Sequence, residues 1–143
     1  MKTIKLFILF CTLACMACQS NEKETDSLNG TKWKLAGIVE NETDSLSVLE
    51  PTDCGECYTL VFDTDNTFST FSSTNELMGN YIVDYETYSI HIINFGGTKL
   101  GEIGDGELYY NIWHIVQSFS LEKNKLKLYY EDKKYMLYNQ LND

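Results

Sequence analysis

The sequence contains no arginine. Its 143 residues include 11 basic residues, all lysines, against 21 aspartates and glutamates, which gives a formal charge of −10. Nucleic-acid binding and attraction to anionic lipid headgroups both depend on clustered basic charge, so this shortage argues against both partners. With two histidines, the chain also offers few ligands for a metal. The remaining composition, 43% hydrophobic and 22% charged, predicts one folded domain.

A long hydrophobic run is also missing. The longest, Leu6–Ala17, has 12 residues and would span about 18 Å as a helix, whereas a bilayer core is about 30 Å thick. Lys2 and Lys5 precede this run. A basic segment followed by a short apolar segment is typical of a secretory signal peptide, which we assign to residues 1–17.

The end of the apolar run resembles the lipobox of bacterial lipoproteins. Ala17 precedes Cys18, and a polar stretch follows. In that family the signal peptide is cut before the cysteine, whose thiol carries diacylglycerol and whose new amino group is acylated. The resemblance implies lipidation at Cys18, with Cys15 after Ala14 as the alternative; a plain secretion signal is the other interpretation. Several acyl chains on one residue suffice for stable membrane anchoring.

Residues 18–29 are predicted to be the acylated cysteine and an acidic tether, containing Glu22, Glu24 and Asp26. Such acidic runs resemble the surface-export signals of some Gram-negative lipoproteins, although a solvated spacer fits equally well. The expected location is the Gram-negative envelope, anchored to the outer membrane and facing the periplasm or the surface. Removal of residues 1–17 leaves 9 lysines against 21 acidic residues, a charge of −12.

Alternation of apolar and polar residues dominates the predicted domain, residues 30–143, and indicates β-strands. Strands are expected at residues 32–39, 58–62, 67–71, 79–85, 88–95, 118–122, 125–130 and 135–139. Turn-forming residues at 63–66 and 86–87 predict two hairpins. The acidic segment 40–53 and the glycine-rich segment 96–106 are predicted to be loops, and Val48 to Thr52 in the first is a possible contact site.

One segment has helical rather than β spacing. The pattern predicts a helix from about residue 106 to 116, capped by Asp105, that packs Leu108, Ile112 and Trp113 on the sheet. The fold class is therefore mainly β (α+β): a strongly curved antiparallel sheet or partly open barrel with one short helix.

This order of elements resembles the META domain of bacterial heat-shock-type lipoproteins over about residues 30–141. The residues that carry the resemblance are Trp33, Asn75, Gly79, Tyr81 and Thr98. The family often has a cysteine before the asparagine, where this chain has Thr74, so the family's own disulfide is absent. The resemblance implies a lipocalin-like fold and an envelope-associated role that is mostly unresolved in the family.

Cys54 and Cys57 form a CxxC pair. In a redox protein of the thioredoxin type a helix would follow, but a strand is expected at Tyr58. A zinc site would need two more ligands, and His91 and His114 lack motif spacing. In an exported protein a local disulfide is the default, with free thiols and metal or redox chemistry as the alternatives. We predict no metal and no cofactor.

No catalytic set is evident. His91 and His114 have no nearby nucleophile, and the glycines of segment 96–101 lack the order of a phosphate-binding loop. The leading hypothesis is a non-enzymatic, lipid-anchored envelope protein that acts as a binding or stress-related accessory module. The alternatives are an acidic inhibitor of a cationic envelope enzyme such as a lysozyme, and a minor thiol or redox role of the CxxC pair.

Overall fold

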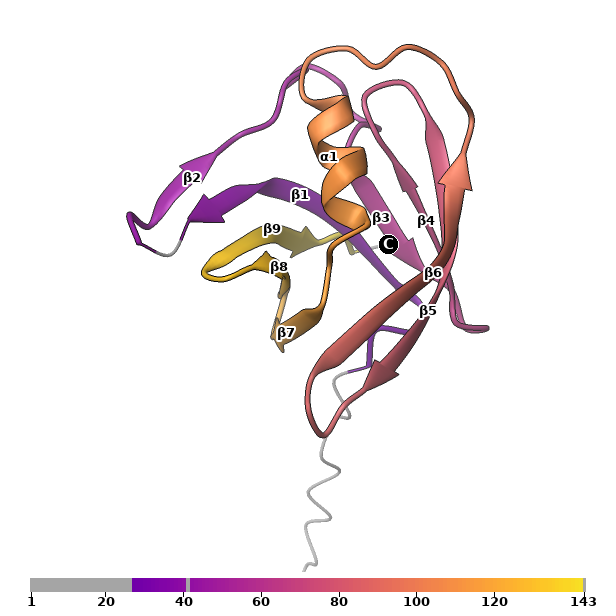
Figure 1. Cartoon of the computed structure of the whole chain (residues 1–143), viewed down its shortest axis with the longest axis vertical. Coiled ribbons are helices and arrows are strands. Elements are labelled where there is room, and N and C mark those ends of the chain that lie inside the picture. The colour runs from indigo at the N-terminus through magenta and orange to yellow at the C-terminus, as the bar shows by residue number, and fades with distance from the viewer. Residues whose placement is uncertain (1–26, 41, 143) are drawn as a thin grey trace, which may run out of the picture.

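The computed structural model describes residues 27–40 and 42–142. Within this part the chain forms nine strands and one helix (Figure 1). The strands are β1 (Thr31–Glu40), β2 (Ser45–Ser47), β3 (Thr59–Phe62), β4 (Thr67–Phe71), β5 (Glu76–Asp84), β6 (Ser89–Gly97), β7 (Ser118–Glu122), β8 (Lys125–Glu131) and β9 (Lys134–Gln140). The helix α1 (Gly106–Trp113) connects β6 to β7.

Antiparallel pairing curls the sheet into a ring. The order is β1-β3-β4-β5-β6-β7-β8-β9, and β9 pairs back with β1 from Trp33↔Gln140 to Glu40↔Lys134. The least extensive strand pairing in the ring is between β6 and β7, which share the pair Ser89↔Ser118. Strand β2 is an edge strand outside the ring, paired to the end of β1. The predicted strongly curved antiparallel sheet with one short helix is confirmed.

Side chains fill the interior of the ring, because alternate residues of each strand point inward. The largest fully buried side chains from the strands are Trp33, Phe62, Phe68, Tyr81, Tyr138, Leu60, Leu77, Ile90 and Leu126. Helix α1 lies against the ring between β1 and β6 (Figure 1) and adds Tyr109 and Trp113 to this core. Trp113 stacks on Phe68 with ring centroids 4.7 Å apart. The interior of the ring is therefore a core of packed side chains.

The helix turns a different face inward from the one predicted. It ends at Trp113, three residues before the predicted end, and Ile112 and Trp113 are buried as expected. The prediction for Leu108 is wrong, because this side chain is 48% exposed. Tyr109 takes the buried place.

Tyr109 can be fully buried because its hydroxyl has partners inside the ring. It forms hydrogen bonds with the hydroxyls of Thr70, at 2.5 Å, and Tyr138, at 2.9 Å. Burial raises the pKa of Tyr109, so the phenol stays protonated. These hydrogen bonds satisfy a polar group that would otherwise be costly to bury.

Asp105 is the N-cap residue of α1, as predicted, but its side chain bonds elsewhere. Asp105 occupies the N-cap position but makes no capping hydrogen bond. Its Oδ2 accepts the backbone N–H of Glu50 at 2.8 Å, and its own N–H donates to the Glu50 carbonyl at 2.7 Å. This reciprocal pair fastens the loop after β2 to the beginning of α1.

Two segments predicted to be loops belong to strands. Ser45–Ser47 forms β2, which approaches β1 at Gly37, where a Cβ would lie 2.5 Å from the Ser47 carbonyl oxygen. Gly96 and Gly97 continue β6, and a Cβ on Gly97 would lie 2.0 Å from the Glu76 carbonyl oxygen. In both places glycine permits close backbone approach, and at Gly97 this approach lets the strand continue where the glycine-rich pattern predicts a loop.

The first described residues pack on the ring. Leu28, which the sequence assigns to the tether, is fully buried. Asn29 accepts a hydrogen bond from the hydroxyl of Tyr81 through its Oδ1. The packed domain thus includes the last residues of the predicted tether.

Candidate functional site

The predicted lipidation residues, Cys18 and Cys15, lie outside the described residues. In the described part, no helix is both long enough and apolar enough to cross a membrane.

The CxxC pair forms a disulfide in the structure. Cys54 and Cys57 have an S–S distance of 2.07 Å, and strand β3 follows them almost at once. The ammonium group of Lys34 donates to the carbonyls of Cys54, at 3.1 Å, Gly55, at 2.9 Å, and Cys57. Burial lowers the pKa of Lys34. The disulfide and the three hydrogen bonds from Lys34 hold the loop before β3, which is a structural role for both cysteines.

Two of the residues that carry the META resemblance, Asn75 and Thr98, lie in one polar cluster. Oδ1 of Asn75 accepts hydrogen bonds from the Thr98 hydroxyl, at 2.8 Å, and the Leu100 N–H, at 2.7 Å. Its Nδ2 donates to the Leu100 carbonyl at 2.9 Å and to Glu102 at 2.6 Å. Asn75 is buried, so it holds the loop after β6 against the beginning of β5.

Glu102 is the centre of this cluster. Its carboxylate accepts hydrogen bonds from four consecutive residues at distances of 2.6 to 3.1 Å: Ser72, Ser73, Thr74 and Asn75. Burial acts to raise the pKa of Glu102, but these hydrogen bonds outweigh it and lower the pKa. We call these five residues the Glu102 cluster. Sequence reasoning missed Glu102, although the unbroken run of hydroxyl and amide donors at 72–75 was a usable signal.

The other motif residues serve the packing of the ring. A Cβ at Gly79 would lie 2.8 Å from the ring of Phe68, so glycine gives that aromatic residue its room. Burial raises the pKa of Tyr81 to about 12, which keeps its hydroxyl a donor to Asn29. Trp33 is buried and donates from Nε1 to the Thr31 hydroxyl at 2.7 Å.

A cleft of about 560 Å³ lies beside the Glu102 cluster, between the ends of β5 and β6, the following loop and α1. Its lining includes Phe95, Lys99 and Tyr110, besides Asn75 and Glu102. The carboxylate and amide that face it are hydrogen-bonded within the protein. These two groups hold the loop and have little hydrogen-bonding capacity left for a ligand, although the charged side chains of Lys99 and Glu107 also line the cleft.

The two histidines lie in different surroundings. His91 is exposed on β6 opposite Ile82, and His114 packs edge-on against the rings of Phe95 and Tyr110. Residues 27–40 and 42–142 contain no group of three or more histidine, cysteine, aspartate or glutamate side chains that could hold a metal ion.

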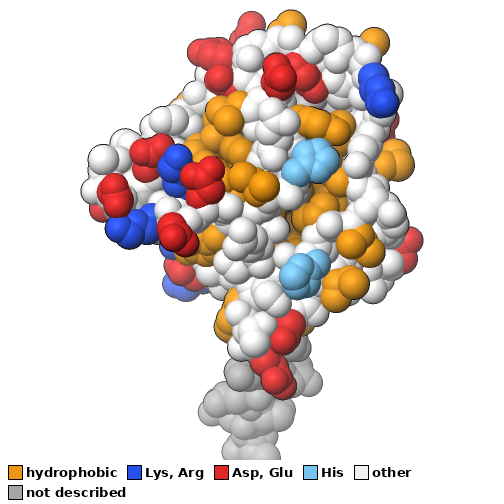
Figure 2. Space-filling model, viewed as in Figure 1, with side chains coloured by type: hydrophobic (Ala, Val, Ile, Leu, Met, Phe, Trp, Pro, Cys, Tyr) orange, Lys and Arg blue, Asp and Glu red, His pale blue; other side chains and the backbone are white. Residues whose placement is uncertain are grey.

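A second hollow, of about 450 Å³, lies on the other side of α1. Its floor consists of buried apolar side chains from β1, the loop after β2, α1 and β8: Ile38, Leu49, Ile112 and Tyr130. Its walls are the exposed side chains of Val48, Leu108 and Ile115. We call these seven residues the α1 groove. Figure 2 shows apolar side chains gathered on this face, with carboxylates beside and above them.

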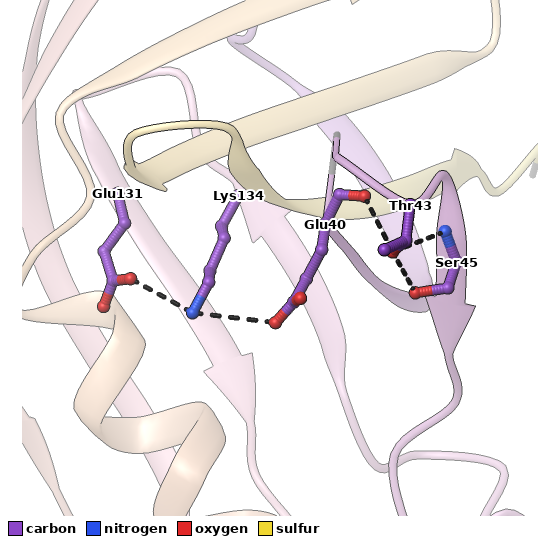
Figure 3. Close-up of polar contacts among 5 residues, drawn as sticks. All are labelled: Glu40, Thr43, Ser45, Glu131 and Lys134. Carbon is purple, nitrogen blue, oxygen red and sulfur yellow. Dashed lines mark hydrogen bonds and ion pairs between the residues drawn. The ribbon is translucent and has the colours of Figure 1, made fainter.

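Charged side chains form the rim of the α1 groove where β1 meets the β8–β9 turn. Nζ of Lys134 lies 3.2 Å from a carboxylate oxygen of Glu131 and 3.6 Å from one of Glu40 (Figure 3). The hydrogen bond and charge of Glu131, followed by the charge of Glu40, raise the pKa of Lys134. The Thr43 hydroxyl contacts that of Ser45 at 2.7 Å and shapes the β1–β2 turn (Figure 3).

Comparison with known proteins places the chain in a family. A protein of Tannerella forsythia named "Putative lipoprotein" is 32% identical over 126 residues, which cover 84% of this chain and 81% of the relative. The chain belongs to the family of this lipoprotein. That membership supports a lipoprotein of the cell envelope. No family model matches the chain, so its likeness to the META domain stays a resemblance.

Solved structures share the fold. A protein from Burkholderia xenovorans, solved by NMR, aligns with a TM-score of 0.66 at 18% identity and covers 81% of this chain and 85% of its own. A DUF4847 family protein from Bacteroides vulgatus aligns with a TM-score of 0.60 at 13% identity over 81% of this chain and 96% of its own. At these identities the likeness describes the fold alone.

Proposed function

We propose that this lipoprotein is a non-enzymatic binding module, tethered to the envelope by acyl chains on Cys18, that engages a partner through its outer surface. The single observation that supports this most directly is the packed interior of the ring, where Trp33, Tyr109 and Trp113 occupy the space a small ligand would need. Because these side chains fill the interior of the ring, we infer that recognition takes place on its outer surface.

The lipobox at Cys18 and membership in the lipoprotein family support the proposed anchor. We place the anchor in the outer membrane, with the acidic tether carrying the domain to the periplasm or the surface. The META-like relationship belongs to the same proposal: Asn75 and Thr98 hydrogen-bond directly, which gives these motif residues a shared role in the loop after β6. For Cys54 and Cys57 we propose a structural disulfide rather than a redox role.

Intact mass of the membrane-extracted chain tests the anchor. We expect a chain that begins at Cys18 and carries diacylglycerol and an amide-linked acyl group. Cys18→Ser should abolish incorporation of labelled palmitate, whereas the matched control Cys15→Ser should retain it. Label lost in Cys15→Ser and kept in Cys18→Ser would move the anchor to Cys15. A parent chain without any label would refute lipid anchoring.

Photo-crosslinking in intact cells tests surface binding. A photoreactive residue at Ile115, in the α1 groove, should give a defined adduct, whereas one at Ile82, an equally apolar exposed position on β5, should not. Adducts at neither position would refute a partner on these faces.

A further inference from the structure

The α1 groove is preformed. The loop that carries Val48 and Leu49 is fastened to the beginning of α1 by two hydrogen bonds between Glu50 and Asp105, one between backbone groups and one from the Glu50 N–H to the Asp105 carboxylate. The hydroxyl of Tyr58 donates to the same Glu50 carbonyl. One wall and part of the floor are therefore fixed before any partner arrives, which reduces the entropy lost on binding.

The walls of the α1 groove are apolar and about half exposed. Val48, Leu108 and Ile115 are 59%, 48% and 42% exposed and face the same hollow. Their clustering over a buried apolar floor resembles the apolar centre of a protein interface rather than scattered surface residues.

The rim of the α1 groove is acidic. The charged residues that line the hollow are Glu40, Asp105, Glu131 and Lys134, a formal charge of −2. Lys134 lies between Glu131 and Glu40 and offers little attraction to an acidic partner (Figure 3). An apolar hollow with such a rim complements an apolar side chain flanked by positive charges.

We propose that the α1 groove docks a segment of a cationic protein, in which an apolar side chain is flanked by lysine or arginine. This proposal rests on the proposed function and names the class of partner. The apolar side chain fills the hollow over Ile112, and the flanking cations face Glu40 and Glu131. Inhibition of a basic envelope enzyme, such as a lysozyme, would be one consequence of this docking.

Peptide binding to the full chain in phosphatidylcholine nanodiscs tests the docking. The probes are fluorescein-labelled peptides with the cores Lys-Lys-Leu-Lys-Lys, Lys-Lys-Ser-Lys-Lys and Glu-Glu-Leu-Glu-Glu, with empty nanodiscs as the blank. We expect the lysine–leucine peptide to bind about tenfold or more tightly than the serine peptide, because burial of one leucine contributes at least that factor. The glutamate peptide should not bind.

Variants assign the binding to the groove. Leu108→Ser with Ile115→Ser should weaken the lysine–leucine peptide about tenfold or more, whereas Ile82→Ser, which removes an equally exposed apolar side chain elsewhere, should not. The lysine–leucine peptide should bind the parent chain more tightly in about 0.01 M salt than in about 1 M salt. Glu40→Gln with Glu131→Gln should remove most of this difference in affinity. Unfolding curves of each variant exclude loss of fold.

Equal weakening by Ile82→Ser, or equal binding of the serine peptide, would overturn the docking proposal. The acyl mass of the same preparation separates this failure from that of the proposed function. If the chain is acylated and forms adducts in cells but does not bind the lysine–leucine peptide, the cationic partner alone is refuted. A chain without acyl groups and without adducts refutes the proposed function.

Discussion

The Glu102 cluster and the α1 groove lie on opposite sides of the same helix and have opposite characters. In the cluster, four donors from residues 72–75 meet one carboxylate, and each of these polar groups finds its partner inside the protein. In the groove, three apolar side chains face a hollow with no protein group against them in the described part of the chain. The cluster holds the loop after β6 in place, whereas the groove is the site at which we propose docking.

Within the Glu102 cluster, the largest loss of stability should come from removal of the Asn75 side-chain amide. Asn75→Ala leaves the Thr98 hydroxyl, the Leu100 backbone groups and part of the Glu102 carboxylate without their partner. We expect a loss of about 3 kcal/mol in the free energy of unfolding, measured by urea denaturation. A variant as stable as the parent would show that the cluster does not support the fold.

Acid should weaken the cluster. The hydrogen bonds that lower the pKa of Glu102 in the folded chain favour its charged form, so their stabilisation is present above the unfolded pKa, about 4.3, and is lost as pH falls through the lower folded pKa. Glu102→Gln should cost about 1–2 kcal/mol at neutral pH and progressively less in acid. A cost that is constant from neutral pH to about pH 3 would contradict this account.

The groove walls should behave differently in folding. Leu108→Ser with Ile115→Ser should lower the free energy of unfolding by only about 1 kcal/mol, because these side chains are about half exposed, at 48% and 42%. The matched control Ile112→Ala, on the floor of the groove, should cost about 2–5 kcal/mol. Equal costs in thermal or urea unfolding would remove the distinction between walls and floor.

The smallest effect concerns the rim cation. Lys134→Gln should leave the melting temperature unchanged, because its ion pairs with Glu131 and Glu40 lie at the surface. It frees both carboxylates, so the lysine–leucine peptide should bind a few-fold more tightly at low salt. Weaker binding would show that Lys134 contacts the partner favourably.

The hairpins could be predicted from the sequence because period-two alternation and turn residues such as Asn66 are local signals. The helix could be predicted, but its inner face could not. Hydropathy favours Leu108, whereas Tyr109 is buried only because Thr70 and Tyr138, from distant strands, satisfy its hydroxyl. The glycines predict a loop at Gly97, because the sequence does not reveal that the Glu76 carbonyl approaches the backbone of Gly97 closely.

The candidate sites were harder to predict for the same reason. Glu102 lies 29 positions from Ser73, and their contact exists only once the ring has closed. The α1 groove joins residues from β1, the loop after β2, α1 with the segment directly after it, and β8. Of these, only the loop around Val48 carried a local signal, its length and acidity.

Mapping of the lysine–leucine peptide by NMR on the full chain in phosphatidylcholine nanodiscs tests the central claim most directly. The account predicts chemical-shift changes in the methyl groups of Val48, Leu108 and Ile115, with none at Ile82. Changes concentrated instead around Phe95, Lys99 and Tyr110, in the cleft beside the Glu102 cluster, would contradict it.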